Sequence, residues 1–216
     1  MKKPIDYSLY LVTDRPCLNN QTLEKAVEQA ILGGVTLVQL REKNLDSRAF
    51  FEQALNIKAI CQKYNVPLLI NDRVDIAQAV DADGVHVGQS DLPCSIVRQI
   101  LGKGKIIGVS ARSVEQAIQA KQDGADYLGV GAMFTTTTKA DANTVTIETL
   151  ATIRQAVDLP VVAIGGINVD TLPALLRQLA KANTRIDGVA VVSAILANDH
   201  PQLAAQTLKQ TLQDSL

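Results

Sequence analysis

The sequence predicts an α/β protein, a single (β/α)8 TIM barrel that spans residues 1–216. Three observations favour this fold. Short apolar runs alternate with longer segments of helical periodicity about eight times, and the chain length is near the lower end for such a barrel. The apolar runs are continuous, as expected of parallel strands that are covered on both faces. Polar residues directly follow several of these runs, so in a parallel barrel they would converge on one face.

The apolar runs are expected to form strands because each is short and bounded by turn-forming residues. In chain order they are residues 8–13, 36–40, 67–70, 84–87, 106–109, 127–130, 161–164 and 188–192. Tight turns such as Asp83-Gly84 and Asp187-Gly188 lead into several of them. Such turns are typical of a helix that ends just before a strand begins.

The segments between the strands are expected to be helices, since their apolar residues recur at intervals of three and four. In chain order they are residues 23–31, 46 or 47 to 64, 74–80, 93–101, 114–122, 147–157, 169–182 and 201–210. Gly33-Gly34 would end the first helix, Asp46 or Ser47 would cap the second, and Pro93 suits the first turn of the fourth. Residues 133–145 are polar and rich in Thr, which predicts a long loop on the active face.

An open, doubly wound sheet is the alternative architecture. It is less favoured because no GxGxxG motif follows any strand and because the number of strand–helix units is high.

The composition favours small-molecule partners over nucleic acid or membranes. The formal net charge is −1 and Trp is absent, so neither a basic patch nor an aromatic stacking platform is expected. The chain has no apolar run of about 18 residues, which a membrane span would need. Cys17, Cys61 and Cys94 are far apart and lack CxxC spacing, which argues against a disulfide framework or a zinc cluster. We therefore expect a cytoplasmic protein, either a monomer or a homo-oligomer.

Two cations follow the second strand. Arg41 and Lys43 are two residues apart, and alternate residues of an extended segment point the same way. Together they could hold one anion, with Arg as a bidentate donor and Lys as a point charge. The alternative is a solvated surface cluster with Glu42, which these residues taken alone would favour.

Two carboxylates follow the third and fourth strands, which are neighbours in a barrel. Asp72 and Asp91 would each repel a nearby anion by roughly 3 kcal/mol at about 5 Å, for an effective dielectric constant of about 20. A divalent cation reverses that sign, and carboxylates with phosphate oxygens and water are the ligands that Mg²⁺ prefers. The pair therefore predicts a Mg²⁺ site. Separate ion pairs, such as Asp72 with Arg73, are the alternative.

Neutral hydrogen-bonding side chains also stand at strand ends, namely Gln39, Asn71, Gln89 and Ser110. They could recognise a polar heterocycle or a phosphate without adding charge, although each alone could be a turn former or a cap.

The last two strands predict a phosphate site. Gly165-Gly166 follows the seventh strand and Val192-Ser193 the eighth, where barrels commonly bind phosphate through backbone N–H groups. The alternative is a plain turn.

His86 lies within a strand and is expected to be a packed core residue, so no pair of acid and base residues is obvious.

Taken together, the chain resembles the thiamine-phosphate synthase family over nearly its whole length. The motifs that carry the resemblance are Gln39-Leu40-Arg41-Glu42-Lys43, Asn71-Asp72-Arg73, Asp83-Gly84-Val85-His86-Val87-Gly88-Gln89-Ser90-Asp91, Ile107-Gly108-Val109-Ser110, Thr136-Thr137-Thr138-Lys139 and Ile164-Gly165-Gly166-Ile167.

The resemblance implies that hydroxymethylpyrimidine diphosphate is joined to a thiazole phosphate, which is often carboxylated, with Mg²⁺ as cofactor. The implied ligands of the pyrimidine diphosphate are Gln39, Leu40, Arg41, Glu42, Lys43, Asn71, Ser110 and Lys139. The implied ligands of the thiazole phosphate are Thr136, Thr137, Thr138, Gly166, Val192 and Ser193. Asp72 and Asp91 would hold Mg²⁺, and the catalytic residues would be Arg41, Lys43, Ser110 and Lys139.

Three other functions remain as alternatives. A related thiazole tautomerase would not need the diphosphate and Mg²⁺ residues that are present here. An epimerase or aldolase barrel would need a base or a Schiff-base lysine at a strand end. A regulatory barrel would bind thiazole phosphate without turnover.

Overall fold

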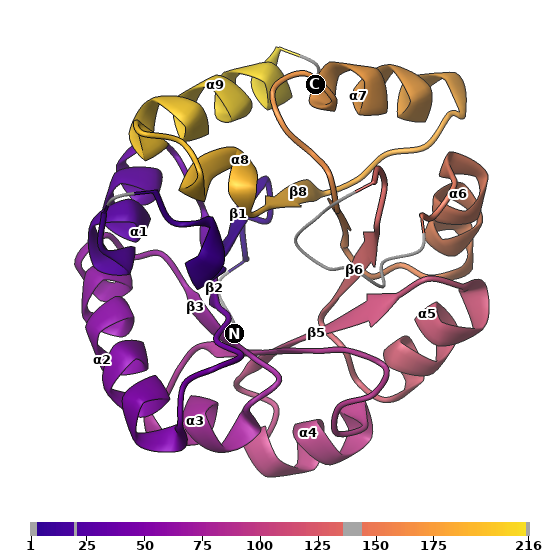
Figure 1. Cartoon of the computed structure of the whole chain (residues 1–216). Helices are drawn as coiled ribbons and strands as arrows, with labels where there is room; N and C mark the ends of the chain where they lie inside the picture. Colours follow the sequence, from indigo (N-terminus) through magenta and orange to yellow (C-terminus); the bar gives the residue numbers. More distant parts are fainter. Residues whose placement is uncertain (1–3, 20, 136–143, 215–216) are drawn as a thin grey trace.

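The computed structural model describes residues 4–19, 21–135 and 144–214. Within this part of the chain, eight parallel strands form a closed barrel in which each strand pairs with its sequence neighbours and the last pairs with the first. Figure 1 looks into the barrel and shows the helices in a ring around it. The predicted (β/α)8 barrel is confirmed. The open sheet is excluded, because it would leave two edge strands unpaired.

The strands lie where the apolar runs predict them, with bounds that differ by at most two residues. They are β1 (Leu9–Val12), β2 (Leu37–Leu40), β3 (Leu68–Asn71), β4 (Gly84–Val87), β5 (Ile106–Ala111), β6 (Tyr127–Gly131), β7 (Val161–Ile164) and β8 (Gly188–Val191).

The helices also follow the prediction in order. They are the 3₁₀ turn η1 (Arg15–Cys17), α1 (Leu23–Leu32), α2 (Ser47–Lys63), α3 (Val74–Ala79), α4 (Cys94–Leu101), α5 (Val114–Gln122), α6 (Ile147–Ala156), α7 (Leu172–Lys181), α8 (Ser193–Leu196) and α9 (Pro201–Gln213). Of the two predicted caps of α2, Asp46 is the one that forms, and its side chain accepts a hydrogen bond from the N–H of Ala49 at 2.9 Å. Such a bond satisfies one of the donors left over at a helix start.

Two differences from the prediction have local causes. The helix α7 begins three residues later than expected, because the side chain of Asn168 accepts hydrogen bonds from the N–H groups of Asp170 and Thr171 and holds them in a turn. The short elements η1 and α8 were not predicted. Neither is long enough to show a helical repeat.

The continuous apolar strands serve two cores. Successive side chains of a strand point to opposite faces, so Leu9 and Leu11 of β1 pack outward against the helices. Tyr10 and Val12 point inward and pack in the barrel interior. Both faces of each strand are therefore covered, which explains why the runs lack polar alternation.

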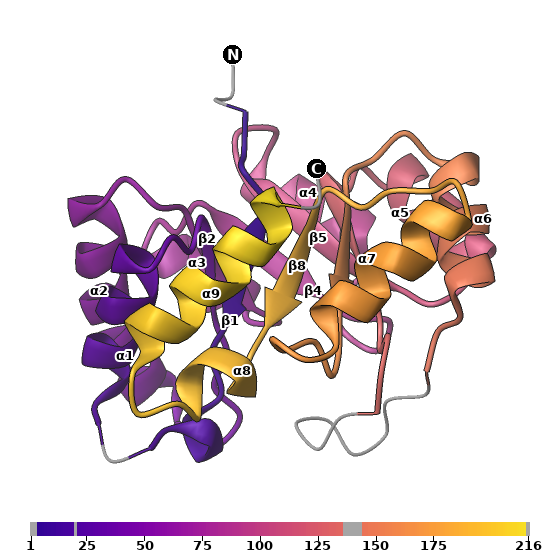
Figure 2. The same cartoon turned by 90° about the horizontal axis from the view of Figure 1, so that it is seen from above.

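The carboxyl ends of the strands share one end of the barrel. Figure 2 shows α8 directly beyond the arrowhead of β8. Because the strands are parallel, every loop that follows a strand opens at this end. In the described ranges, no helix is long and apolar enough to cross a membrane.

Candidate active site

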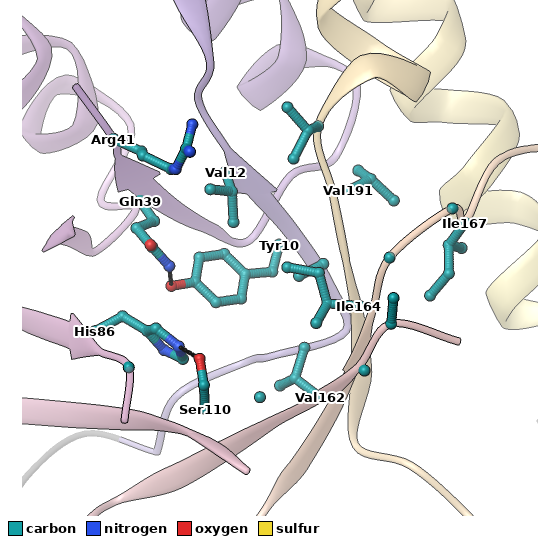
Figure 3. Close-up of a pocket in the computed structure, with 18 of the residues that line it drawn as sticks. Tyr10, Val12, Gln39, Arg41, His86, Ser110, Val162, Ile164, Ile167 and Val191 are labelled. Carbon is teal, nitrogen blue, oxygen red and sulfur yellow. Dashed lines mark hydrogen bonds between the residues drawn. The ribbon is translucent and has the colours of Figure 1, made fainter. Parts of the chain in front are cut away.

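A cavity of about 1190 Å³ opens at the carboxyl ends of the strands. Its lining comes from the strands and from the loops that follow them, so side chains far apart in the sequence meet there (Figure 3). Of the predicted site residues, the cavity wall includes Gln39, Arg41, Lys43, Asn71, Asp72, Asp91, Ser110, Gly166, Val192 and Ser193. The volume exceeds that of common small-molecule sites. It leaves room for two ligands of moderate size.

Arg41 and Lys43 both face the cavity, as their alternate spacing after β2 predicts. The guanidinium of Arg41 donates to the carboxylate of Asp14, and the ammonium of Lys43 lies 2.5 Å from the carboxylate of Asp72. Arg41 and Lys43 therefore do not form the alternative solvated cluster with Glu42. Each cation is instead held at the cavity wall by a carboxylate.

Leu40 and Glu42 lie between these cations in the sequence, but the structure does not bring their side chains to the cavity. Leu40 is fully buried in the core between the sheet and the helices. The carboxylate of Glu42 lies 2.7 Å from the guanidinium of Arg15, and its side chain is only 4% exposed. Alternation along the chain turns both away from the site that Arg41 and Lys43 face.

Asp72 and Asp91 meet at the ends of β3 and β4. The backbone N–H of Gly88 donates to the carboxylate of Asp91 at 2.7 Å. Burial raises the pKa of Asp91 and the neighbouring carboxyl group of Asp72 raises it further, whereas the Gly88 bond and the charge of Lys43 act in the opposite direction. The alternative pair of Asp72 with Arg73 is not formed, because Arg73 bonds to Asp75 at 2.6 Å.

The donor set fits Mg²⁺. Among the described residues there is no cluster of three or more His, Cys, Asp or Glu side chains that could hold a metal by itself. Mg²⁺ differs from zinc in taking only one or two protein carboxylates, with water and substrate phosphates completing its shell. Asp72 and Asp91 supply two such carboxylates at the edge of the cavity, beside the cations that suit a phosphate.

A chain of hydrogen bonds, here called the buried polar chain, crosses the cavity floor. The amide nitrogen of Gln39 donates to the hydroxyl of Tyr10 at 2.5 Å, and this hydroxyl lies 2.8 Å from that of Tyr127. The Tyr127 hydroxyl lies 2.8 Å from Nδ1 of His86, whose Nε2 lies 2.9 Å from the hydroxyl of Ser110. The first and last of these bonds are visible in Figure 3. The expectation that His86 is a packed core residue is wrong, because it is half-buried and lines the cavity.

Two glycines on β5 and β6 make room for the buried polar chain. A Cβ atom at Gly108 would lie 2.1 Å from the ring of Tyr127, and one at Gly129 would lie 3.0 Å from the ring of His86. Both glycines sit inside strands, where glycine often marks a close approach of another group. That signal could have pointed to the buried aromatic and imidazole groups from the sequence.

The side of the cavity opposite Asp72 and Asp91 is formed by the loops after β7 and β8. Gly165 and Gly166 both have positive φ angles, 99° and 66°. A Cβ atom at Gly166 would lie 2.7 Å from Cβ of Phe134, so this loop packs directly on the loop after β6. Val192 and Ser193 come from the start of α8 and face the same space. Thr136, Thr137, Thr138 and Lys139 lie outside the described residues.

Sequence reasoning missed several polar residues of the cavity wall. Arg112 follows Ser110 by two residues, the spacing of Arg41 and Lys43, and its guanidinium has no ion-pair partner in the described ranges. Gln116, Asn168 and Thr171 also line the cavity. The two-residue spacing after a strand is the signal that could have identified Arg112.

Comparison with known proteins gives matches along almost the entire chain. The family model described as thiamine monophosphate synthase matches residues 9–195. A thiamine-phosphate synthase of Ruminiclostridium cellulolyticum is 59% identical over 208 residues, covering 96% of each chain. One of Clostridium botulinum strain Eklund 17B is 55% identical over 210 residues, covering 97% of this chain and 96% of that protein. A solved thiamine phosphate pyrophosphorylase of Pyrococcus furiosus has a TM-score of 0.86 at 36% identity, covering 98% of both chains.

Proposed function

Because the chain belongs to the thiamine monophosphate synthase family, we propose that it condenses 4-amino-2-methyl-5-hydroxymethylpyrimidine diphosphate with a thiazole phosphate. The products are thiamine phosphate and pyrophosphate, with CO₂ as a third product when the thiazole is carboxylated. The chain is thus a transferase of thiamine biosynthesis. The observation that carries the proposal is one cavity that has cations and carboxylates on one side and the Gly165-Gly166 turn after β7 on the other.

Arg41 and Lys43 bind the diphosphate of the pyrimidine substrate, with Asn71 beside them. All three line the cavity at the ends of β2 and β3. Negative charge grows on the departing pyrophosphate, so fixed cations stabilise the transition state more than the ground state. Lys139, outside the described residues, is the further predicted cation.

Asp72 and Asp91 are the proposed Mg²⁺ ligands. The raised pKa of Asp91, which burial and the nearby Asp72 cause, supports this assignment because a divalent cation would relieve the repulsion. When bound, Mg²⁺ acts as a Lewis acid and neutralises charge on phosphate oxygens.

The chemistry is a dissociative substitution. The bond between the exocyclic methylene carbon and the diphosphate oxygen breaks, and its electron pair leaves with pyrophosphate. The electron-rich aminopyrimidine stabilises the carbocation, and the lone pair of the thiazole nitrogen forms the new carbon–nitrogen bond. Breaking the carbon–oxygen bond removes no proton, so leaving-group stabilisation matters more than a general base.

Gly166, Val192 and Ser193 bind the phosphate of the thiazole substrate. This part of a TIM barrel, after strands seven and eight, is a frequent phosphate site. The left-handed backbone at Gly166 supports close approach of a ligand to the main chain. Thr136, Thr137 and Thr138 are the further predicted ligands.

The remaining proposals concern the whole chain. Residues 1–216 form one TIM-barrel domain, its partners are small molecules without nucleic acid or membrane, and its location is cytoplasmic.

The direct test is to incubate the purified protein with both substrates and Mg²⁺ and to quantify thiamine phosphate and pyrophosphate. We expect equal amounts of the two products, no product when either substrate is omitted, and loss of turnover in EDTA. Conversion of a thiazole phosphate alone would indicate a tautomerase. Binding of thiazole phosphate without turnover would indicate a regulatory barrel.

A further inference from the structure

The buried polar chain has a hydrogen-bond direction that its own residues determine. We propose that Tyr127 is a positioning residue: through His86 it makes the hydroxyl of Ser110 a hydrogen-bond donor to the pyrimidine substrate. The identity of that substrate rests on the proposed function, whereas the direction of the chain rests on the geometry and the burial of its own residues.

The direction begins at Gln39. An amide nitrogen can only donate, so the hydroxyl oxygen of Tyr10 accepts from it at 2.5 Å. Tyr10 is 1% exposed, and its other hydrogen-bond partner is the hydroxyl of Tyr127 at 2.8 Å. If Tyr10 did not donate to Tyr127, its buried hydrogen would be left without a partner, which is costly. Tyr10 therefore donates and Tyr127 accepts.

Tyr127 passes the direction on to His86. Tyr127 is fully buried, so its own hydrogen also needs an acceptor, and Nδ1 of His86 lies 2.8 Å away. Burial raises the pKa of both tyrosines well above the usual range, so both hydroxyls keep their protons. Neither phenol can become an acceptor only, and the direction of the chain is preserved.

His86 transmits the direction to Ser110. A neutral imidazole that accepts at Nδ1 carries its proton on Nε2, and this atom lies 2.9 Å from the hydroxyl oxygen of Ser110. Ser110 accepts there, so its own hydrogen points to a further partner in the cavity. The side chain of Gln89 also bonds to the backbone carbonyl of Ser110 at 2.7 Å, which helps to fix the residue. The substrate atom that the Ser110 hydroxyl meets must therefore be an acceptor, either a ring nitrogen or a diphosphate oxygen.

The tautomer of His86 is the decisive observable, and the chain has only two histidines. In untagged protein, His200→Gln removes the signals of the exposed one, so ¹⁵N–¹H correlation spectra report His86 alone. We expect the neutral form with its proton on Nε2. A proton on Nδ1, or on both nitrogens, would overturn the proposal, and this result is independent of whether the protein turns over substrate.

Tyr127→Phe tests the link to Ser110. It keeps the ring but removes the donor to Nδ1, so we expect a mixed His86 tautomer and a KM for the pyrimidine diphosphate raised about fivefold, roughly the worth of one hydrogen bond. The KM for thiazole phosphate should stay unchanged. In a Ser110→Ala background, Tyr127→Phe should cause no further rise in the KM for the pyrimidine diphosphate. An equal effect in both backgrounds would contradict the proposal.

Tyr7→Phe is the matched control. The ring of Tyr7 packs against that of Tyr127, with centroids 4.9 Å apart, but its hydroxyl is not part of the buried polar chain. We expect both the His86 tautomer and the KM values to be unchanged. If Tyr7→Phe matched the effect of Tyr127→Phe, loss of ring packing would explain the result and the proposal would fail.

Discussion

The ammonium of Lys43 lies 2.5 Å from the carboxylate of Asp72. This ion pair joins a residue proposed to bind the diphosphate to one proposed to bind Mg²⁺, at the ends of the neighbouring strands β2 and β3. The side chain of Lys43 is 50% exposed, and exposed pairs of this kind contribute about 1 kcal/mol or less. Lys43 can therefore exchange this carboxylate for a substrate oxygen at little cost.

Lys43→Ala should lower kcat/KM for the pyrimidine diphosphate by at least about tenfold, because it removes a charge that stabilises the departing pyrophosphate. Steady-state kinetics measures this loss. Lys63→Ala is the control, since the exposed Lys63 at the end of α2 pairs with Glu28 of α1. Equal kinetics for Lys43→Ala and wild type would remove Lys43 from the site.

Asp72→Asn should raise the Mg²⁺ concentration needed for half-maximal turnover by about tenfold or more, because a neutral amide is a much weaker ligand. Asn tolerates the left-handed backbone that Asp72 adopts, with φ of 60°, so the fold should be kept. Asp75→Asn, three residues further along the chain and in the first turn of the helix α3, serves as the control. An unchanged Mg²⁺ titration would refute the metal assignment.

Gly166→Ala should destabilise the protein by about 1–3 kcal/mol, because the new Cβ atom would meet Phe134 and the backbone φ is 66°. Urea unfolding measures the loss, and the KM for thiazole phosphate should rise. At Gly104 an added Cβ atom meets nothing within 4 Å. Gly104→Ala should therefore be close to neutral, and similar losses for both variants would contradict the packing argument.

Arg112→Gln should weaken binding of anionic ligands several-fold, since its guanidinium faces the cavity and is not neutralised by an ion pair in the described part of the chain. Inhibition by pyrophosphate, measured with and without the substitution, detects the change. Arg185→Gln removes an exposed charge at a separate surface depression and should have no effect. An unaltered inhibition constant in Arg112→Gln would show that Arg112 does not contact anions.

Alkylation should discriminate among the three thiols. Burial raises the pKa of Cys61 to about 12 and that of Cys94 to about 11. A raised pKa keeps the proton on sulfur, so at pH 8 only about one Cys61 in ten thousand is a thiolate, and each further pH unit raises that fraction tenfold. Mass spectrometry after iodoacetamide treatment should show Cys17 modified first. Early modification of Cys61 would show that it is accessible in the folded protein.

Local patterns predicted several residues of the cavity wall. Arg41, Lys43, Asp72 and Asp91 were predicted because polar residues directly after apolar strands have one destination in a parallel barrel. The same reasoning could not decide whether the side chains of Leu40 and Glu42 face the cavity, because alternation along the segment sends neighbouring side chains to opposite faces. The strand register decides which of them face the cavity.

The sequence by itself determined the order of strands and helices and the ring of polar residues at the strand ends, because both depend on spacing along a few residues. Only the tertiary structure decided that Tyr10 meets Tyr127, 117 residues away, and that His86 turns into the cavity. Those contacts depend on closure of the barrel and on the space left by Gly108 and Gly129 on adjacent strands. No local pattern encodes which side chains will meet across a closed barrel, since that depends on the register of every strand between them.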